Sequence, residues 1–301
     1  MKAWPVWRSM LFVPAHVDKF VANAHTRNAD ACILDLEDSV PIPKKAEARS
    51  ALAAAAAVVS QSGAAVLARI NGEPTMAEQD LRAAVIPEIR ALMVPKVERA
   101  EDVRSLDARI GTIERGCGME IGHTLLIAQI ESVHGLSRMD EIAASSPRLM
   151  GLILGSEDFS ISAGMEPTPE TLYGPNQQLV FACRRTGILP FGFPGSISVF
   201  RNEGLLRQLI GRARDMGFVG SYAIHPNQVA LMNELFSPSA KAVADAEELL
   251  AAGEAALAKG RGAFEFQGRM VDPPVVARAR EIIRRHAALT ASHASPKVEK
   301  L

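Results

Sequence analysis

Acidic side chains repeatedly follow short apolar runs of the sequence, at the points where buried strands would end. These acids are Asp35, Glu37, Asp38, Glu131, Glu157 and Asp158. Two basic side chains, Arg69 and Lys96, occupy the same kind of position after two further runs. If the runs are parallel strands of one barrel, their carboxyl ends meet at one mouth. The sequence therefore predicts a ring of carboxylates that also contains one Arg and one Lys.

Within this ring, Glu131 and Asp158 follow neighbouring runs and are the pair expected to share one cation. Ligation by carboxylates, with no His or Cys nearby, suits Mg²⁺ or Mn²⁺. Mg²⁺ takes one or two carboxylates and leaves positions for water and substrate, so it would bind an α-keto or α-hydroxy acid. Arg69 would then add a bidentate clamp for a carboxylate or oppose a developing enolate.

The simpler alternative is that the strand-end charges only pair with one another. Asp35 fits this structural role best, because Leu34 and Leu36 place it within the end of its strand. Lys96 as a Schiff-base lysine is disfavoured, since surrounding carboxylates would keep its amine protonated. Asp272 precedes two prolines, which is the pattern of a helix N-cap with Pro at the first helical position.

The apolar runs that would carry the ring are each of strand length and apolar on both faces, as expected for parallel strands under helices. They are Met10–Val13, Ala31–Leu34, Ala65–Ile70, Ala91–Val94, Thr124–Ile130, Leu149–Leu154, Ile188–Phe193 and Tyr222–Ile224. The stretches between them are long enough for crossover helices. Helices are predicted over Lys44–Val59, Ser137–Ser145, Glu170–Thr186 and Glu203–Arg214.

Eight strand–helix repeats within about 230 residues indicate a closed TIM (β/α)8 barrel over residues 1–236. An open doubly wound sheet would need a glycine-rich phosphate turn after its first strand. The first run ends instead in Pro14-Ala15-His16, and neither GxGxxG nor GxxxxGK[ST] follows any run. Nucleotide-binding folds of that kind are therefore excluded.

The pattern changes after residue 236, where an appended C-terminal helical lid or arm is predicted over residues 237–289. Ser237-Pro238-Ser239 would open a helix that runs through Leu257, and Asp272-Pro273-Pro274 would open a last helix that ends near Ala288. The polar residues 290–301 are predicted to be a disordered tail.

Composition narrows the class of protein further. The formal net charge is −1, which gives no bulk attraction for nucleic acid. The 3 cysteines are far apart in the sequence, which fits a reducing compartment, and Cys32 lies in an apolar run that should be core. No apolar run is long enough to span a bilayer or to act as a signal peptide, so a cytoplasmic protein without a membrane partner is expected.

Several of these segments together resemble one known family. They are RSMLFVP at 8–14, ACILDLED at 31–38, RIN at 69–71, VPK at 94–96, QIE at 129–131, GSED at 155–158, AIHPNQV at 223–229 and GRMVD at 268–272. Their order resembles that of the citrate lyase β-subunit-like proteins of the HpcH/HpaI aldolase superfamily, which includes malyl-CoA and citramalyl-CoA lyases. The match runs from about residue 8 to 285.

The resemblance implies a metal-dependent carbon–carbon lyase that acts on a CoA thioester such as malyl-CoA or citramalyl-CoA and yields acetyl-CoA plus glyoxylate or pyruvate. It implies Mg²⁺ on Glu131 and Asp158 and a homotrimer or homohexamer in which Asp272 acts as acid or base in a neighbouring subunit's site. Glu37 and Asp38 would position metal waters or the base. The candidate substrate-binding residues are Arg69, Gly155, Pro95 and Lys19, the last for the CoA.

One segment departs from the commonest family pattern. Many relatives carry acids after the seventh strand, whereas Phe191–Ser198 carries none, which leaves the acyl group open. The alternatives are a citrate lyase β subunit acting on an acyl-carrier thioester, a CoA-independent keto-acid aldolase, and a non-catalytic barrel that binds CoA or a metabolite.

Overall fold

The protein is described from a computed structural model, which places residues 4–258, 260 and 262–294. The chain divides into two compact units, residues 1–236 and 237–301. Each unit is described by itself. None of the helices in the placed part of the chain is long and apolar enough to cross a membrane.

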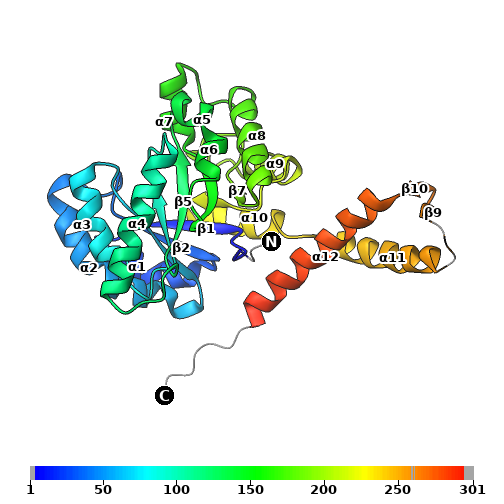
Figure 1. The fold of residues 1–301 in the computed structure, drawn as a ribbon, viewed down its shortest axis with the longest axis horizontal. Coiled ribbons are helices and arrows are strands. Elements are labelled where there is room, and N and C mark those ends of the chain that lie inside the picture. Colours follow the sequence, from blue (N-terminus) through cyan, green and yellow to red (C-terminus); the bar gives the residue numbers. More distant parts are fainter. Residues whose placement is uncertain (1–3, 259, 261, 295–301) are drawn as a thin grey trace. The chain divides into compact units, whose positions relative to one another are not determined.

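The first unit contains eight parallel strands that pair in sequence order. They are β1 Ser9–Pro14, β2 Ala31–Asp35, β3 Ala65–Arg69, β4 Ala91–Val94, β5 Leu125–Ile130, β6 Leu149–Leu154, β7 Leu189–Phe191 and β8 Ser221–Ala223. The ladder runs from β7 through β1 to β8, and a parallel bridge between Phe191 and Gly220 joins its two ends. The predicted barrel is therefore confirmed, and it closes at a seam between β7 and β8. Figure 1 shows the strands of this unit with their helices.

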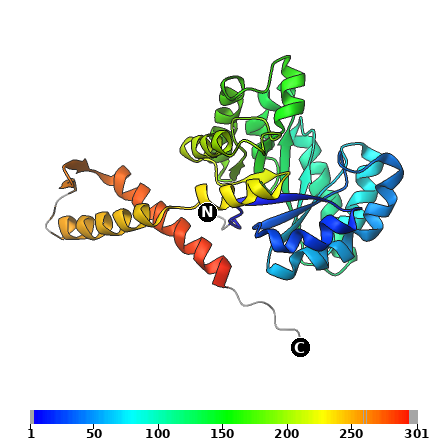
Figure 2. The same ribbon diagram turned by 180° about the vertical axis from the view of Figure 1, so that it is seen from behind.

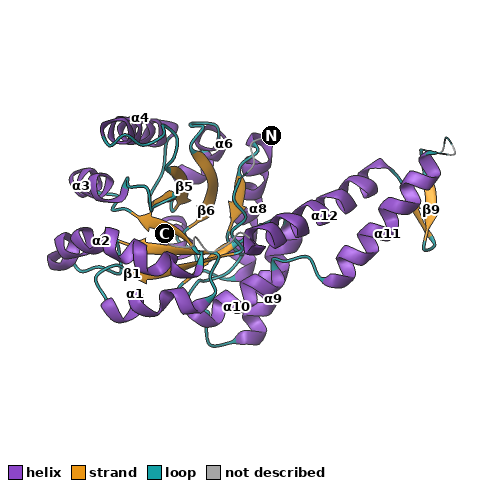
Figure 3. Ribbon diagram, turned by 90° about the horizontal axis from the view of Figure 1, so that it is seen from below, coloured by secondary structure: helices purple, strands orange, loops and turns teal. Residues whose placement is uncertain are grey.

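Helices follow the strands and form the outer layer of this unit, as Figures 2 and 3 show. They are α1 Asp18–Ala24, α2 Lys45–Val59, α3 Pro74–Ala84, α4 Ala100–Gly116, α5 Val133–Ser137, α6 Met139–Ala143, α7 Ser156–Ala163, α8 Pro169–Thr186, α9 Glu203–Met216 and α10 Pro226–Leu235. The helix predicted over Ser137–Ser145 is shorter than expected, because α5 ends at Ser137 and α6 covers only Met139–Ala143.

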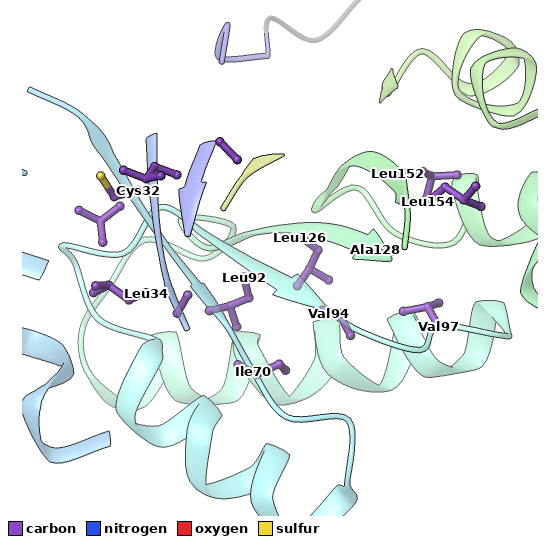
Figure 4. Close-up of a cluster of buried hydrophobic side chains, with 14 of the residues drawn as sticks. Cys32, Leu34, Ile70, Leu92, Val94, Val97, Leu126, Ala128, Leu152 and Leu154 are labelled. Carbon is purple, nitrogen blue, oxygen red and sulfur yellow. The ribbon is translucent and has the colours of Figure 1, made fainter. Parts of the chain in front are cut away.

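Alternation along each strand divides the core into two hydrophobic clusters. On β5, Leu125 and Ile127 belong to the cluster inside the barrel, whereas Leu126, Ala128 and Ile130 belong to the cluster between strands and helices. Figure 4 shows part of the outer cluster, with side chains from several strands. Because both faces of every strand are covered, the strands read as continuous apolar runs. The predicted core position of Cys32 is confirmed, since this residue is fully buried.

The second unit is a helical arm with a small hairpin. Helix α11 (Ala240–Leu257) packs against α12 (Pro273–Ala294), and β9 (Phe264–Phe266) pairs antiparallel with β10 (Arg269–Val271). The hairpin was not predicted. The last helix runs past its expected end near Ala288, so residues 290–294 are helical rather than part of a disordered tail, and residues 295–301 lie outside the described part of the chain.

Gly220, at the barrel seam, has no room for a side chain. A Cβ atom there would lie 2.0 Å from the carbonyl oxygen of Trp7 and 2.9 Å from that of Arg8, two backbone atoms that cannot easily move away. The carbonyl of Gly220 also accepts a hydrogen bond from the amide of Gly192 at 2.9 Å. The seam therefore requires a residue without a side chain.

We predict that Gly220→Ala lowers the free energy of unfolding by about 3 kcal/mol, because the new methyl group clashes with the backbone just before β1 and forces the start of β8 away from it. Urea denaturation measures the change. Gly211→Ala is the matched control: Gly211 lies in α9 with no atom within 4 Å of a Cβ. It should leave the protein as stable or stabilise it by about 0.5–1 kcal/mol, because alanine favours helix. Equal effects of the two variants would contradict the prediction.

Candidate active site

Arg69, the last residue of β3, forms a buried ion pair with Asp35, its register partner at the end of β2. Nε donates to Oδ1 and Nη2 donates to Oδ2, each at 2.7 Å. Burial alone would raise the pKa of Asp35, but the hydrogen bonds and charge of Arg69 outweigh it and hold this pKa below its usual value. Asp35 therefore stays ionised and fixes the guanidinium plane.

This pairing changes what Arg69 offers a substrate. A bidentate clamp on a substrate carboxylate was expected, but the two-pronged edge made by Nε and Nη2 is already bound to Asp35. The remaining nitrogen, Nη1, lies 3.1 Å from Oδ2 of Asp38 and 2.9 Å from Oε2 of Glu37. Only the Nη1 side of Arg69 is therefore directed at the other acids of the ring.

Glu37 is buried, with 6% of its surface exposed, and its Oε2 atom has no hydrogen-bond donor among the described residues. The 2.9 Å approach of Arg69 Nη1 is an ion-pair distance whose angle does not make a hydrogen bond. Burial raises the pKa of Glu37 to about 8, even though the charge of Arg69 acts to lower it. Glu37 is thus largely protonated at neutral pH and can exchange a proton, whereas Asp38 is exposed.

The loop that carries Glu37 is held from outside the barrel by Lys45, the first residue of α2. Its Nζ donates to the carbonyl oxygens of Leu36 and Glu37 and to Oδ1 of Asn71, each at 2.7 Å. Asn71 Nδ2 in turn donates to the Leu36 carbonyl at 2.8 Å. Lys45 was not among the predicted site residues, since it lies ten positions after Asp35 and only the fold brings its ammonium to the loop.

Glu131 follows β5 and lies at the second acidic cluster of the mouth. Its Oε2 accepts a hydrogen bond from the backbone amide of Lys96 at 2.9 Å, and its Oε1 accepts one from Gln129 Nε2 at 3.0 Å. Lys96 has a left-handed backbone, with φ of 55°, which is uncommon for a residue other than glycine. The Lys96 backbone thus directs its amide at the carboxylate, while the Lys96 side chain is exposed.

Gly155, after β6, leaves the space that Glu131 occupies. A Cβ atom at this position would lie 2.5 Å from Cγ and 2.6 Å from Oε1 of Glu131. The Gly155 amide also donates to the carbonyl oxygen of Ile130 at 3.0 Å, so β6 and the Glu131 backbone are tied together. The absence of a side chain therefore sets the position of Glu131, and substrate binding by Gly155 stays a prediction.

Asp158 does not lie in a loop but in the first turn of α7, where it is exposed. Burial raises the pKa of Glu131 to about 7, and the negative charge of Asp158 adds to the rise. The two carboxylates therefore repel each other across the mouth, as ligands of a shared cation do before it binds. The buried Oε1 atom of Gln129, beside them, has no partner within the described chain.

The donor set fits a weakly held, hard cation. The described residues contain no group of three or more His, Cys, Asp or Glu that could hold a metal ion. Two carboxylates from Glu131 and Asp158 are what Mg²⁺ ordinarily takes from a protein, with water and substrate oxygens completing its shell. A transition metal that needs several nitrogen or sulfur ligands does not fit this site.

Glu157 is not part of this pair. Its Oε1 accepts a hydrogen bond from Ser196 Oγ at 2.5 Å, and Ser196 Oγ lies 2.5 Å from Ser198 Oγ. Glu157 therefore ties the segment after β7 to the start of α7. The segment after β7 carries no acid of its own, and Glu157 from the connection after β6 reaches it instead.

The remaining predicted site residues are more scattered. Pro95 is buried at the end of β4, and Lys19 is exposed in α1. Asp272 belongs to the second unit, where Oδ1 accepts a hydrogen bond from the amide of Val275 at 3.3 Å and so caps α12. The capping pattern recognised in the sequence is thus present, and a catalytic role for Asp272 stays a prediction.

Two aromatic residues also contribute to the mouth and were not predicted. The guanidinium of Arg69 lies 4.7 Å from the ring centroid of Phe12 on β1, and Phe12 meets Tyr222 of β8 edge to face at 5.4 Å. Phe12 alternates with Leu11 and Val13, which belong to the outer cluster, so strand periodicity was the available signal for its inward position.

Comparison with known proteins finds relatives that match most of the chain. L-malyl-CoA/beta-methylmalyl-CoA lyase of Cereibacter sphaeroides is 38% identical over 92% of each chain. Citrate lyase subunit beta of Escherichia coli K12 is 36% identical, again over 92% of each chain. The crystal structure of RipC from Yersinia pestis is 34% identical, covers 78% of this chain and 96% of its own, and superposes with a TM-score of 0.62.

A second solved structure is that of CitE from Mycobacterium tuberculosis in complex with magnesium, acetoacetate and coenzyme A. It is 28% identical, covers 94% of this chain and 98% of its own, and superposes with a TM-score of 0.74. The model of the HpcH/HpaI aldolase/citrate lyase family matches residues 8–226, which include the whole barrel mouth. The chain belongs to the HpcH/HpaI aldolase/citrate lyase family.

Proposed function

We propose that this protein is a Mg²⁺-dependent carbon–carbon lyase that cleaves or forms a β-hydroxyacyl-CoA such as malyl-CoA or citramalyl-CoA, with acetyl-CoA and glyoxylate or pyruvate as the products. The observation that carries the proposal is that Glu131 is buried at the end of β5 and feels the charge of Asp158, at the same barrel mouth as the ion pair of Arg69 with Glu37. The names of the relatives support the class of reaction, and the magnesium and coenzyme A in the CitE complex support the ligands.

Glu131 and Asp158 would hold Mg²⁺, and Mn²⁺ is the nearest substitute because it accepts the same oxygen ligands. Bound there, the cation would act as a Lewis acid on the oxygens of the oxo-acid half of the substrate. The hydrogen bonds that Lys96 and Gln129 donate keep the Glu131 carboxylate oriented.

In the cleavage direction a base takes the proton of the β-hydroxyl group, the carbon–carbon bond breaks, and its electron pair passes to the acetyl thioester as an enolate. The Nη1 edge of Arg69 would stabilise the negative enolate oxygen. The enolate carbon then takes a proton, for which Asp272 is the proposed donor. Glu37 and Asp38 lie beside Arg69 and would position the base or the ordered waters.

Asp272 would serve the site of a neighbouring subunit, which makes a homotrimer or homohexamer the proposed assembly. Lys19 is proposed to contact the CoA and Pro95 to line the substrate. Both residues would contact parts of the ligand that do not react.

A second candidate is a citrate lyase β subunit that acts on an acyl-carrier thioester, favoured by the 36% identity to that subunit of E. coli. Purified protein assayed with Mg²⁺ against malyl-, citramalyl- and related CoA esters separates the two. Release of glyoxylate or pyruvate from free CoA esters supports the first candidate. Cleavage only with an acyl carrier and partner subunits supports the second.

We predict that Asp158→Asn lowers kcat/KM by at least about 100-fold, because one of two metal-binding carboxylates becomes neutral. The rate of oxo-acid release at saturating Mg²⁺ measures the effect. Glu157→Gln is the matched control, since it removes the adjacent carboxylate that bonds to Ser196, and most of the activity should remain. Full activity of Asp158→Asn would contradict the assignment of Asp158 as a metal ligand. Wild-type turnover that persists in EDTA would contradict a metal-dependent reaction.

Magnesium binding should depend on pH. Without metal, burial raises the pKa of Glu131 to about 7, so the folded state binds this proton more tightly than the unfolded chain does. The stability of the metal-free protein therefore falls as the pH rises from the ordinary pKa of a glutamate side chain toward about 7. Mg²⁺ must displace the proton, so its apparent affinity should drop about tenfold per pH unit below this pKa.

Thermal unfolding with and without Mg²⁺ at about pH 6 and pH 8 measures this linkage, and we predict a larger rise in Tm at the higher pH. Glu131→Gln should abolish both the Mg²⁺-induced rise and its pH dependence. A rise of equal size at both pH values in the wild type would contradict the assignment of Glu131 as a ligand.

Two substitutions distinguish the helix-capping role of Asp272 from its proposed role as a proton donor. Asn also caps helices, so Asp272→Asn should keep the stability of the wild type while it loses at least about 100-fold in turnover. Asp272→Ala should lose the same activity and about 1 kcal/mol of stability in addition. Turnover and thermal melting are measured on both. An Asp272→Asn variant with full activity would reduce Asp272 to a helix cap.

A further inference from the structure

Lys45, the half-buried first residue of α2, directs its whole ammonium group at one small region of backbone. An ammonium group has three N–H donors. Nζ of Lys45 lies 2.7 Å from each of three acceptors, which are the carbonyl oxygens of Leu36 and Glu37 and Oδ1 of Asn71. Two of the three belong to residues 36–40, which we call the Glu37 loop. Lys45 therefore holds this loop by its backbone.

The third acceptor is itself fixed by a buried network. Nδ2 of Asn71 donates to the Leu36 carbonyl at 2.8 Å and to Oδ2 of Asp80 at 2.6 Å. Asp80 is fully buried in α3 and also accepts a hydrogen bond from Nε of Arg49 at 2.6 Å. Because these bonds occupy the amide nitrogen of Asn71, its oxygen is left to accept from Lys45. The place of the ammonium group is thus set by residues of α2, α3 and two strand-end loops.

On its other side the Glu37 loop is held by Asp35. Oδ1 accepts a hydrogen bond from the Glu37 amide at 3.0 Å, and Oδ2 accepts one from the Ser39 amide at 3.1 Å. The amide of Glu37 is therefore bound to Asp35 and its carbonyl to Lys45. The Glu37 carboxylate approaches Nη1 of Arg69 at 2.9 Å, but no described residue donates a hydrogen bond to its Oε2 atom. The direction of this carboxyl group consequently depends on the backbone that carries it.

We propose that Lys45 is a positioning residue for the proposed reaction, because it holds the Glu37 loop so that the Glu37 carboxyl group faces Nη1 of Arg69. The inference rests on the proposed function for the reaction that Lys45 serves. Lys45 acts through the backbone of Glu37 and not on the substrate. A lysine that only anchored α2 would affect stability, whereas a positioning residue affects turnover, since a displacement of about 1 Å can cost about 100-fold in rate.

The test is Lys45→Ala, with Lys44→Ala as the matched control. Lys44 is the preceding residue, and its side chain is 51% exposed and forms an ion pair with Glu47 at 2.6 Å. Both substitutions put the best helix-forming residue at the start of α2. Two measurements are made on both variants: kcat and KM with the best CoA ester of the screen at saturating Mg²⁺, and hydrogen–deuterium exchange of the backbone amides of residues 36–40 by mass spectrometry.

We expect Lys45→Ala to lower kcat by about 10- to 100-fold, because the Glu37 carboxyl group is no longer held in place. KM and the affinity for Mg²⁺ should stay close to those of the wild type, since Glu131 and Asp158 lie on other connections of the barrel. The amides of the Glu37 loop should exchange faster, because two of its carbonyl groups lose the Lys45 donor. Lys44→Ala should match the wild type in every measurement.

A small amine should replace the missing group. Alanine keeps Cβ, so the atoms that the substitution removes correspond to n-propylammonium. Added n-propylammonium should therefore raise kcat of Lys45→Ala and slow the exchange of its Glu37 loop. Tetramethylammonium carries the same charge but has no N–H donor, and it should do neither. Equal rescue by the two cations would overturn the proposal, because the effect would then come from charge or ionic strength alone.

Wild-type kcat in folded Lys45→Ala would also overturn the proposal. The same holds for a lower kcat without faster exchange in the Glu37 loop, and for equal losses in Lys45→Ala and Lys44→Ala. If Lys45→Ala does not fold, Lys45→Met takes its place in the kcat and exchange measurements, because methionine keeps an unbranched side chain but lacks the ammonium donors.

The exchange measurement separates this inference from the proposed lyase activity. If the wild type turns over none of the CoA esters, the proposed reaction fails. Faster exchange of the Glu37 loop in Lys45→Ala, but not in Lys44→Ala, would then still support Lys45 as the residue that positions Glu37, and unchanged exchange would overturn it. If the wild type turns over and Lys45→Ala matches it in kcat and exchange, the reaction stands and the inference is overturned.

Discussion

The ion pair between Arg69 and Asp35 is the interaction on which the barrel mouth depends. It joins the ends of β2 and β3 by two hydrogen bonds of 2.7 Å, and Asp35 is 1% exposed. Asp35 also accepts hydrogen bonds from the amides of Glu37 and Ser39, so one buried carboxylate fixes both the guanidinium and the following loop. Loss of either partner would leave a buried charge uncompensated, which is far more costly than the pair is favourable.

The same pair separates the protonation states of two acids that are two positions apart. Asp35 receives the strong hydrogen bonds of Arg69, which keep its pKa low, whereas Glu37 is buried without a hydrogen-bonded Oε2 and has a pKa of about 8. Environments that push neighbouring pKa values apart are a common property of sites that move protons. Lys45 completes the arrangement, because its ammonium group holds the backbone carbonyls of Leu36 and Glu37.

Backbone geometry makes room for the second acidic cluster. Gly155 leaves the space that the Glu131 side chain fills, and the left-handed backbone of Lys96 directs an amide at the same carboxylate. Glu131 is thereby held in place before any cation binds, which lowers the reorganisation needed on binding. Asp158, in contrast, is exposed on α7, so its side chain could adjust to the proposed cation.

The sequence by itself determined the barrel, because strands covered on both faces must be apolar throughout, and it placed Glu131, Asp158 and Arg69 at strand ends. It did not determine which groups would pair. Only the tertiary structure paired Nε and Nη2 of Arg69 with Asp35, brought Lys45 to the Glu37 loop, and packed Tyr222 of β8 against Phe12 of β1. The physical reason is that apolar periodicity is a local property of the chain, whereas hydrogen-bond partners and burial depend on strand register and on residues that are distant in sequence.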